Sequence, residues 1–283
     1  MFKRTIPITT IKGVGAGQVA TVEIPTEYRY HQLYFRYTEN GVDVTEANMK
    51  AAITSVDLRL NGKSQRQYTA AELITLNKRK GFAYQDGVLP VFFAEPDART
   101  PGGEDTLAWA IEGNASTFTA QITIAAGRVS PKLEVSAIVD NARGPNGKLL
   151  PLGPIIKTRK FNKGVSAVGL VTMTNDIPRE LGDIRALHFF ETAAADIKSV
   201  TVKVDQVTAF ERDRVLNNAI QKQLGFIPDA AVFHADFMEN GRPEDRLPTS
   251  RPGGKLVGEL RMDIDMATAN DFAILVEYLG QPD

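Results

Sequence analysis

The sequence contains no cysteine, which excludes disulfide bonds, thiolate catalysis and zinc–thiolate sites. Its net charge is only −1, so nucleic acid, an acidic substrate or a membrane surface is not indicated as a dominant partner. It lacks an apolar run of the roughly 20 residues that would span a bilayer. The basic residues after Met1 are not followed by the apolar stretch of a signal peptide. We therefore expect synthesis in the cytoplasm and a fold held together by packing alone.

The most informative feature of the sequence is a pattern that occurs twice. Three features recur at one offset of 144 residues, as in 199 − 55. They are an alternating run at 55–61 and 199–205, a Gly-Phe pair at 81–82 and 225–226, and a Phe-x-Glu triplet at 93–95 and 237–239. This spacing is too long for a solenoid and matches the size of a domain. The sequence therefore predicts two copies of one fold.

Most of the sequence indicates short strands separated by glycine, proline and asparagine turns, which is typical of a sandwich or barrel. Apolar and polar residues alternate through Val19–Ile24 and Phe118–Ile124. The aromatic runs at 33–37 and 187–190 lie 154 residues apart, so the first copy carries ten extra residues (154 − 144). We place these extra residues in a loop at 40–50.

One helix is expected at the equivalent place in each copy. Thr69 and Glu72 have the spacing of a capping box, in which each side chain binds an unpaired amide of the first turn. Thr208 and Glu211 have the same spacing and predict a second helix about five residues longer, with an apolar stripe. The residues of this stripe are Phe210, Leu216, Ala219, Ile220 and Leu224.

The segment 141–154 is rich in turn residues, and we place the domain boundary there, giving domains 1–145 and 146–283. Each copy also has a long polar loop after its Phe-x-Glu triplet, at 95–105 and 239–255. We expect these loops to vary freely and to make contacts between molecules. Deleting 239–255 is predicted to leave both copies folded.

At the residue level the chain resembles the major capsid protein of corticoviruses, which are icosahedral phages with an internal membrane. The resemblance rests on the order and duplication of four features. They are the strand ending in an Asn-Gly turn at 56–62, the capped helix from Thr69 with Phe92-Phe93 after it, the segment 225–239 and the C-terminal strand at 274–280.

The resemblance implies an all-β double jelly roll, two eight-stranded β-sandwiches in tandem, each with one short helix between strands. It implies a homotrimer whose six similar barrels form a pseudo-hexagonal block that tiles the shell. Other implied partners are penton and membrane-associated virion proteins, with no direct contact to nucleic acid. The implied location is the virion, after synthesis in the host cytoplasm.

Candidate sites are few, and no catalytic or cofactor-binding residue is assigned. The glycine-rich segment 12–17 resembles a phosphate loop but precedes a strand, so we expect an N-terminal arm instead. The histidines lack metal-ligand spacing and are expected to pack in the core or between the barrels. These histidines are His31, His188 and His234. Trp109 is expected to pack in the core.

Calcium is a candidate ligand, because the resemblance implies an association with calcium and calcium takes several oxygen ligands. Four acidic residues could supply those oxygens, although the metal site stays unassigned. They are Asp236, Glu239, Asp263 and Asp265.

Two alternative functions stay open at this point. A duplicated sandwich could be an enzyme, such as an amidase acting on glycans or glycopeptides, with an acidic and aromatic cleft. It could also be a carbohydrate-binding module, which would more often carry a secretion signal.

Overall fold

The computed structural model describes residues 2–96, 105–144 and 146–283. The chain forms two compact units, with most residues up to Ile155 in the first and most from Ile156 in the second; the second also includes Arg79–Gly81. The domain limits predicted from the sequence, 1–145 and 146–283, stay a prediction and are distinct from the limits of these compact units. Among the described residues, no helix is both long enough and apolar enough to cross a membrane.

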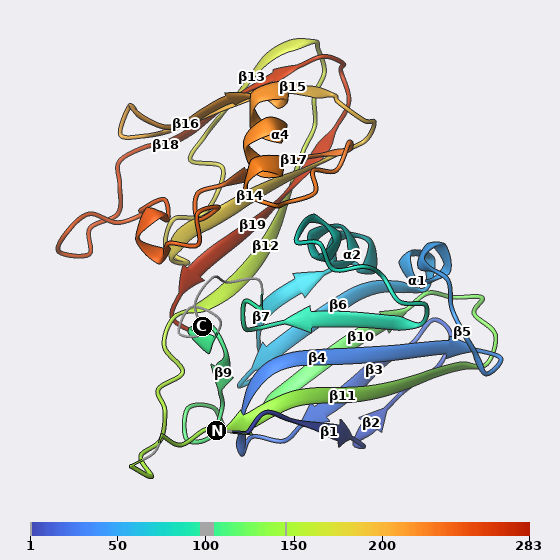
Figure 1. Ribbon diagram of the computed structural model, residues 1–283. Helices are drawn as coiled ribbons and strands as arrows, with labels where there is room; N and C mark the ends of the chain where they lie inside the picture. The colour runs from blue at the N-terminus through green and yellow to red at the C-terminus, as the bar shows by residue number, and fades with distance from the viewer. Residues whose placement is uncertain (1, 97–104, 145) are drawn as a thin grey trace. The chain divides into compact units, whose positions relative to one another are not determined.

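The first unit has two antiparallel sheets that lie face to face (Figure 1). One has the order β1-β11-β4-β5, with β8 and β9 also paired to β4, and the other has the order β2-β3-β10-β6-β7. The strands are β1 Arg4–Ile8, β2 Ile11–Lys12, β3 Val19–Ile24, β4 Tyr28–Glu39, β5 Val42–Asp43, β6 Ile53–Leu60, β7 Lys63–Tyr68, β8 Val88–Phe92, β9 Trp109–Ala110, β10 Phe118–Ile124 and β11 Pro131–Asn141.

The second unit has two four-stranded sheets with the orders β12-β19-β14-β17 and β13-β18-β15-β16. Numbered within the unit, these orders are 1-8-3-6 and 2-7-4-5, the arrangement of a jelly roll. The strands are β12 Ile155–Lys163, β13 Gly169–Thr174, β14 Asp183–Glu191, β15 Ile197–Val204, β16 Val207–Asp213, β17 Val232–Asp236, β18 Leu260–Met266 and β19 Phe272–Gly280.

The first unit has the same order once its three two-residue strands, β2, β5 and β9, are set aside. Its remaining strands, β1, β3, β4, β6, β7, β8, β10 and β11, then pair as 1-8-3-6 and 2-7-4-5. The all-β double jelly roll is therefore confirmed.

The repeat extends to the register of individual residues. Val56 of β6 lies opposite Tyr68 of β7, and Val200 of β15 lies opposite Arg212 of β16. Both members of the second pair are 144 residues beyond the first, as in 200 − 56 and 212 − 68. A one-residue slip would exchange the two faces of a strand, so this match means that the same positions face the core in both units.

The two equivalent helices begin and end at matching residues. Helix α2 spans Ala70–Arg79 and helix α4 spans Arg214–Gln223, both of ten residues. The prediction of a longer second helix was therefore wrong. In α2 the capping box is confirmed, because the Thr69 amide donates to Glu72 (2.7 Å) and the Glu72 amide donates to Thr69 Oγ1 (3.1 Å).

The second predicted capping box was also wrong. Thr208 and Glu211 lie in strand β16, and Asp213 caps α4 by accepting from the Leu216 amide at 2.8 Å. The predicted apolar stripe is not the buried face of α4, because the helix buries Asn217 and Gln221 whereas Leu216 is exposed. Phe210, the first residue of that stripe, is buried but lies in strand β16.

The buried amides of the helices bind the neighbouring strand in both units. Asn77 of α2 donates to the Pro90 carbonyl at 3.0 Å, and Gln221 of α4 donates to the His234 carbonyl at 3.3 Å. The two members of each pair differ by 144 residues between units. Asn217 also donates to the His234 carbonyl (2.9 Å), so side chains from α4 cover the outer edge of β17.

The ten extra residues of the first copy do not form a plain loop. They contain strand β5 and helix α1, Glu46–Ala52, which Thr45 caps and which buries Met49. This helix has only seven residues and buries two apolar side chains, Met49 and Ala52, so its periodic pattern is weak in the sequence.

The core of the first unit is aromatic. Trp109 is fully buried, and its ring centroid lies 4.5 Å from that of Phe93 and 5.5 Å from that of Phe118. The expectation that Trp109 is a core residue is confirmed.

Candidate functional site

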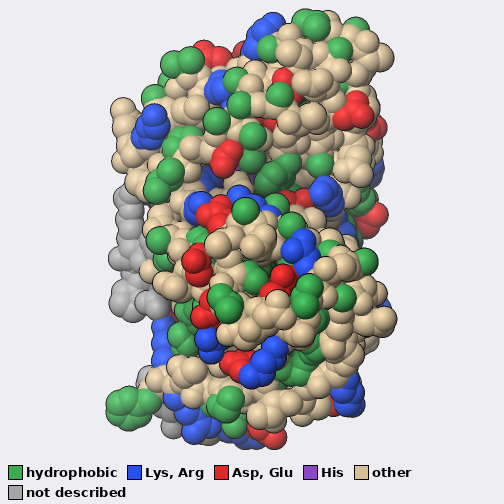
Figure 2. Space-filling view, turned by 90° about the vertical axis from the view of Figure 1, so that its right-hand side faces the viewer, with side chains coloured by type: hydrophobic (Ala, Val, Ile, Leu, Met, Phe, Trp, Pro, Cys, Tyr) green, Lys and Arg blue, Asp and Glu red, His purple; other side chains and the backbone are tan. Residues whose placement is uncertain are grey.

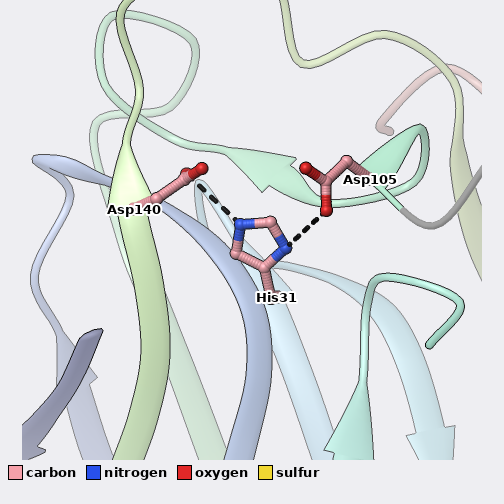
Figure 3. Close-up of side chains that lie close together, drawn as sticks. All are labelled: His31, Asp105 and Asp140. Atoms are coloured by element: carbon pink, nitrogen blue, oxygen red, sulfur yellow. Dashed lines mark ion pairs between the residues drawn. The ribbon is translucent and has the colours of Figure 1, made fainter. Parts of the chain in front are cut away.

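In the first unit, the buried His31 of strand β4 lies between two carboxylates (Figure 3). His31 Nε2 is 3.3 Å from Asp140 Oδ1, at the end of β11, and Nδ1 is 3.3 Å from Asp105 Oδ1, just before β9. His31 is 1% exposed and Asp140 is 3% exposed. The histidine therefore links three segments that are far apart in the sequence.

A β-bulge places His31 in this position. In the β4–β11 pairing, Gln32 lies opposite Ile138 and Tyr30 opposite Val139, so His31 is the extra residue with no partner opposite. Such a residue changes the direction of its side chain relative to the regular pleat. This bulge therefore turns the imidazole out of the regular alternation and toward the carboxylates.

The second unit has a bulge at the equivalent residue, Arg185 of β14. Arg185 and His31 differ by 154 residues, the offset of the two aromatic strands. The Arg185 guanidinium lies 3.6 Å from Glu277 of β19, so each unit places a basic side chain at this bulge beside a carboxylate that is largely shielded from solvent. The bulge is a duplicated feature, whereas the identity of its side chain differs between units.

Basic residues already compensate both carboxylates around His31. Arg29 donates to Asp140 through Nε (2.8 Å) and Nη2 (2.5 Å), and Lys3 Nζ lies 3.0 Å from Asp105 Oδ1. Burial alone would raise the pKa of Asp140, but the hydrogen bonds from Arg29 and the positive charges of Arg29 and His31 hold it below its usual value.

His31, Asp105 and Asp140 form the one group of three or more metal-ligating side chains within the described ranges. The geometry does not fit a metal cage, because the carboxylates face opposite nitrogens of the ring rather than a common point. Calcium also takes six to eight oxygen ligands, which this group does not offer. We therefore interpret it as a structural polar network.

The other two histidines form a direct contact in the second unit. His188 of β14 lies opposite His234 of β17, and their Nδ1 atoms are 2.8 Å apart. Both side chains are buried, at 2% and 1% exposure. The sequence predicted burial of these histidines but not their contact with each other.

The four acidic residues considered for calcium are not brought together. Glu239 binds Arg212 through both carboxylate oxygens (2.6 and 3.0 Å), and Asp263 accepts from Arg261 at 2.9 Å. Asp265 lies 3.7 Å from Lys198, and Asp236 is buried beside Arg79. Calcium binding stays a prediction without a site.

The glycine-rich segment at 12–17 connects two strands and not a strand to a helix. Gly13 adopts φ +74°, and a Cβ there would lie 2.9 Å from the Val19 carbonyl oxygen. Strands β1 and β2 precede this turn and pair with β11 and β3. The predicted free N-terminal arm is therefore wrong, because residues 4–12 belong to the two sheets apart from the short link between the strands.

The predictions for the two long polar loops, 95–105 and 239–255, compare differently with the structure. Most of 95–105 lies outside the described residues. The loop at 239–255 is tied to the second unit, because Leu247 is 4% exposed, belongs to the core and exchanges backbone hydrogen bonds with Ile184. Thr249 donates to the Gly182 carbonyl at 2.9 Å. The expectation that this loop varies freely does not hold for its middle part.

Comparisons with known proteins identify the family. Residues 5–140 match the viral coat protein P2 N-terminal domain, and residues 155–282 match the viral coat protein P2 C-terminal domain. No curated protein matches the sequence.

Solved structures show the same fold. The major capsid protein P2 from bacteriophage PM2 is 22% identical, with 99% of this chain and 97% of that chain covered and a TM-score of 0.83. The atomic structure of Sulfolobus Turreted Icosahedral Virus is 11% identical, with 99% of this chain and 91% of that chain covered and a TM-score of 0.67. The PBCV-1 virus capsid is 12% identical, with 98% of this chain and 93% of that chain covered and a TM-score of 0.63. The resemblance to corticovirus coats is confirmed. Because the two matched domains cover nearly all of the sequence, the chain belongs to the viral coat protein P2 family.

Proposed function

We propose that this viral coat protein is the major shell-forming subunit of an icosahedral phage or provirus with an internal membrane, and that it assembles as a homotrimer. The observation that carries the proposal is the duplication in register of an eight-stranded jelly roll within one coat-protein chain. Three such chains supply six similar units, which closed threefold symmetry can arrange as a pseudo-hexagonal block.

The surface is compatible with blocks that pack side by side. The net charge is −1, and Figure 2 shows acidic, basic and hydrophobic side chains interspersed on the face that it displays. Strong repulsion between identical copies is therefore not expected. The same charge balance favours protein contacts over direct contact with nucleic acid.

The role that we propose is structural and not catalytic. The family is that of a viral coat protein, which supports neither a glycan-processing enzyme nor a carbohydrate-binding module. A coat protein is a component of the virion. We further propose synthesis in the host cytoplasm and contacts with penton and membrane-associated virion proteins.

Electron microscopy of the purified full chain tests this proposal. We expect class averages of compact blocks with six similar lobes and threefold symmetry. Particles with only two lobes would contradict the trimer. Activity on glycopeptides by the same preparation would contradict the structural role.

A further inference from the structure

The buried His188–His234 contact limits the number of protons that the two rings can hold. Each neutral imidazole has one N–H and one lone pair, so two facing nitrogens 2.8 Å apart can share one proton. Two N–H groups cannot face each other at that distance, so His188 and His234 cannot both be imidazolium in this geometry.

The surroundings of the two rings differ. His188 Nε2 lies 3.7 Å from the Glu277 carboxylate, so a positive charge on His188 has a partner. Burial alone would raise the pKa of Glu277, but the positive charges of Arg185 and His188 hold it well below its usual value. This carboxylate is therefore ionised beside His188.

A positive charge on His234 has no such partner. Its Nε2 is buried and has no hydrogen-bond partner among the described residues. Burial holds the pKa of His234 well below its usual value, and the positive charges of Arg79, His188 and Arg214 lower it further. The backbone carbonyl of His234 accepts hydrogen bonds from the side chains of Asn217 and Gln221.

The charged groups around the two rings come from every neighbouring element. They are Arg185 on β14, Asp236 on β17, Glu277 on β19, Arg214 on α4, and Arg79 and Lys80, which belong to the second unit. Arg79 is paired with Asp236 at 2.9 Å, and Arg214 is paired with Glu191. None of the acidic groups contacts the Nε2 atom of His234 in the described structure.

We propose that the His188–His234 contact is a pH-sensitive switch that keeps β14 and β17 paired while His234 is neutral and opens this pairing when His234 takes up a proton. The unfolded chain binds that proton near pH 6.5, the ordinary value for histidine, whereas the folded unit resists it. The stabilising effect is therefore fully present above about pH 6.5 and is lost as the pH falls below it.

Hydrogen exchange of the full chain, read by mass spectrometry between pH 7.5 and 5.0, tests the switch. After correction for the chemical exchange rate, we expect protection of peptides from β14 and β17 to fall by up to about tenfold per pH unit below pH 6.5. Peptides from β6 and β10, in the first unit, provide an internal control within the same molecule. Constant protection of β14 and β17 in the unaltered chain would overturn the proposal.

His234→Asn is the matched variant, because an asparagine amide can occupy the position of Nδ1 opposite His188 without titrating. We expect it to retain protection of β14 and β17 down to pH 5.0. The same loss in this variant as in the unaltered chain would overturn the assignment to His234. His188→Asn is the second variant if His234→Asn does not fold. It leaves His234 buried with the same unpartnered Nε2 atom, so we expect the loss of protection below pH 6.5 to persist, and a flat pH response would overturn the assignment to His234.

Discussion

Arg29 and Asp140 form a two-point ion pair between neighbouring strands of the first unit. They lie directly opposite in the β4–β11 register, and two guanidinium nitrogens donate to the two carboxylate oxygens at 2.8 and 2.5 Å. Asp140 also lies beside His31, so this carboxylate connects the bulged strand to its neighbour.

Asp140→Asn should lower the free energy of unfolding of the first unit by about 3 kcal/mol, because it removes one partner of a buried ion pair. Urea unfolding followed by Trp109 fluorescence measures this, since Trp109 is the only tryptophan and lies in the same core. Asp43→Asn, which breaks an exposed pair with Arg36, is the control and should have a much smaller effect. Equal effects of the two variants would show that burial does not matter here.

The contribution of Asp140 should depend on pH in one direction. Its folded pKa lies below the unfolded value near 3.9, so the unfolded chain binds more protons at acid pH. The stability difference between the unaltered chain and Asp140→Asn is then present at pH 7 and shrinks as the pH falls below about 3.9. Trp109 fluorescence in urea at a series of pH values measures it, and a constant difference down to pH 2.5 would contradict the prediction.

The corrected position of the α4 cap predicts unequal effects of two substitutions. Asp213→Ala should lower the free energy of unfolding by about 0.5–2 kcal/mol, because it leaves the Leu216 amide without its acceptor. Thr208→Ala should change it little, because Thr208 is an exposed residue of β16. Urea unfolding followed by circular dichroism compares them, and a larger loss for Thr208→Ala would favour the helix start predicted from the sequence.

The loop at 239–255 should contribute to stability through Leu247. Leu247→Ala is expected to cost about 2–5 kcal/mol, because it leaves a cavity in the core of the second unit. Leu256→Ala, at a side chain that is 39% exposed, is the matched control and should cost much less. Similar midpoints of urea unfolding for both variants would mean that the loop is dispensable, as the sequence analysis expected.

The sequence predicted the strands well, because the alternation of apolar and polar residues is a local pattern. It predicted the duplication well, because three features recur at one exact offset. Val19–Ile24 and Phe118–Ile124 were predicted with the bounds that the structure has. The α4 start was missed because Thr208 and Glu211 have capping-box spacing although they lie in an alternating strand. Asp213, at 69 + 144, was the signal that could have corrected it.

The polar networks could not be predicted because they depend on pairing between distant strands. His31 meets Asp140 only because a bulge shifts the β4–β11 register. His188 meets His234 only because β14 pairs with β17 across 46 residues. A register that links such distant segments leaves no periodic pattern near either histidine.

The molar mass of the purified chain in solution, measured by light scattering, tests the assembly proposal most directly. The chain mass is 30.9 kDa, and the proposed trimer predicts a stable species of 92.7 kDa, three times that value. The measurement is made with and without added calcium, because calcium binding stays a prediction. A species that stays at 30.9 kDa under both conditions would contradict the trimer.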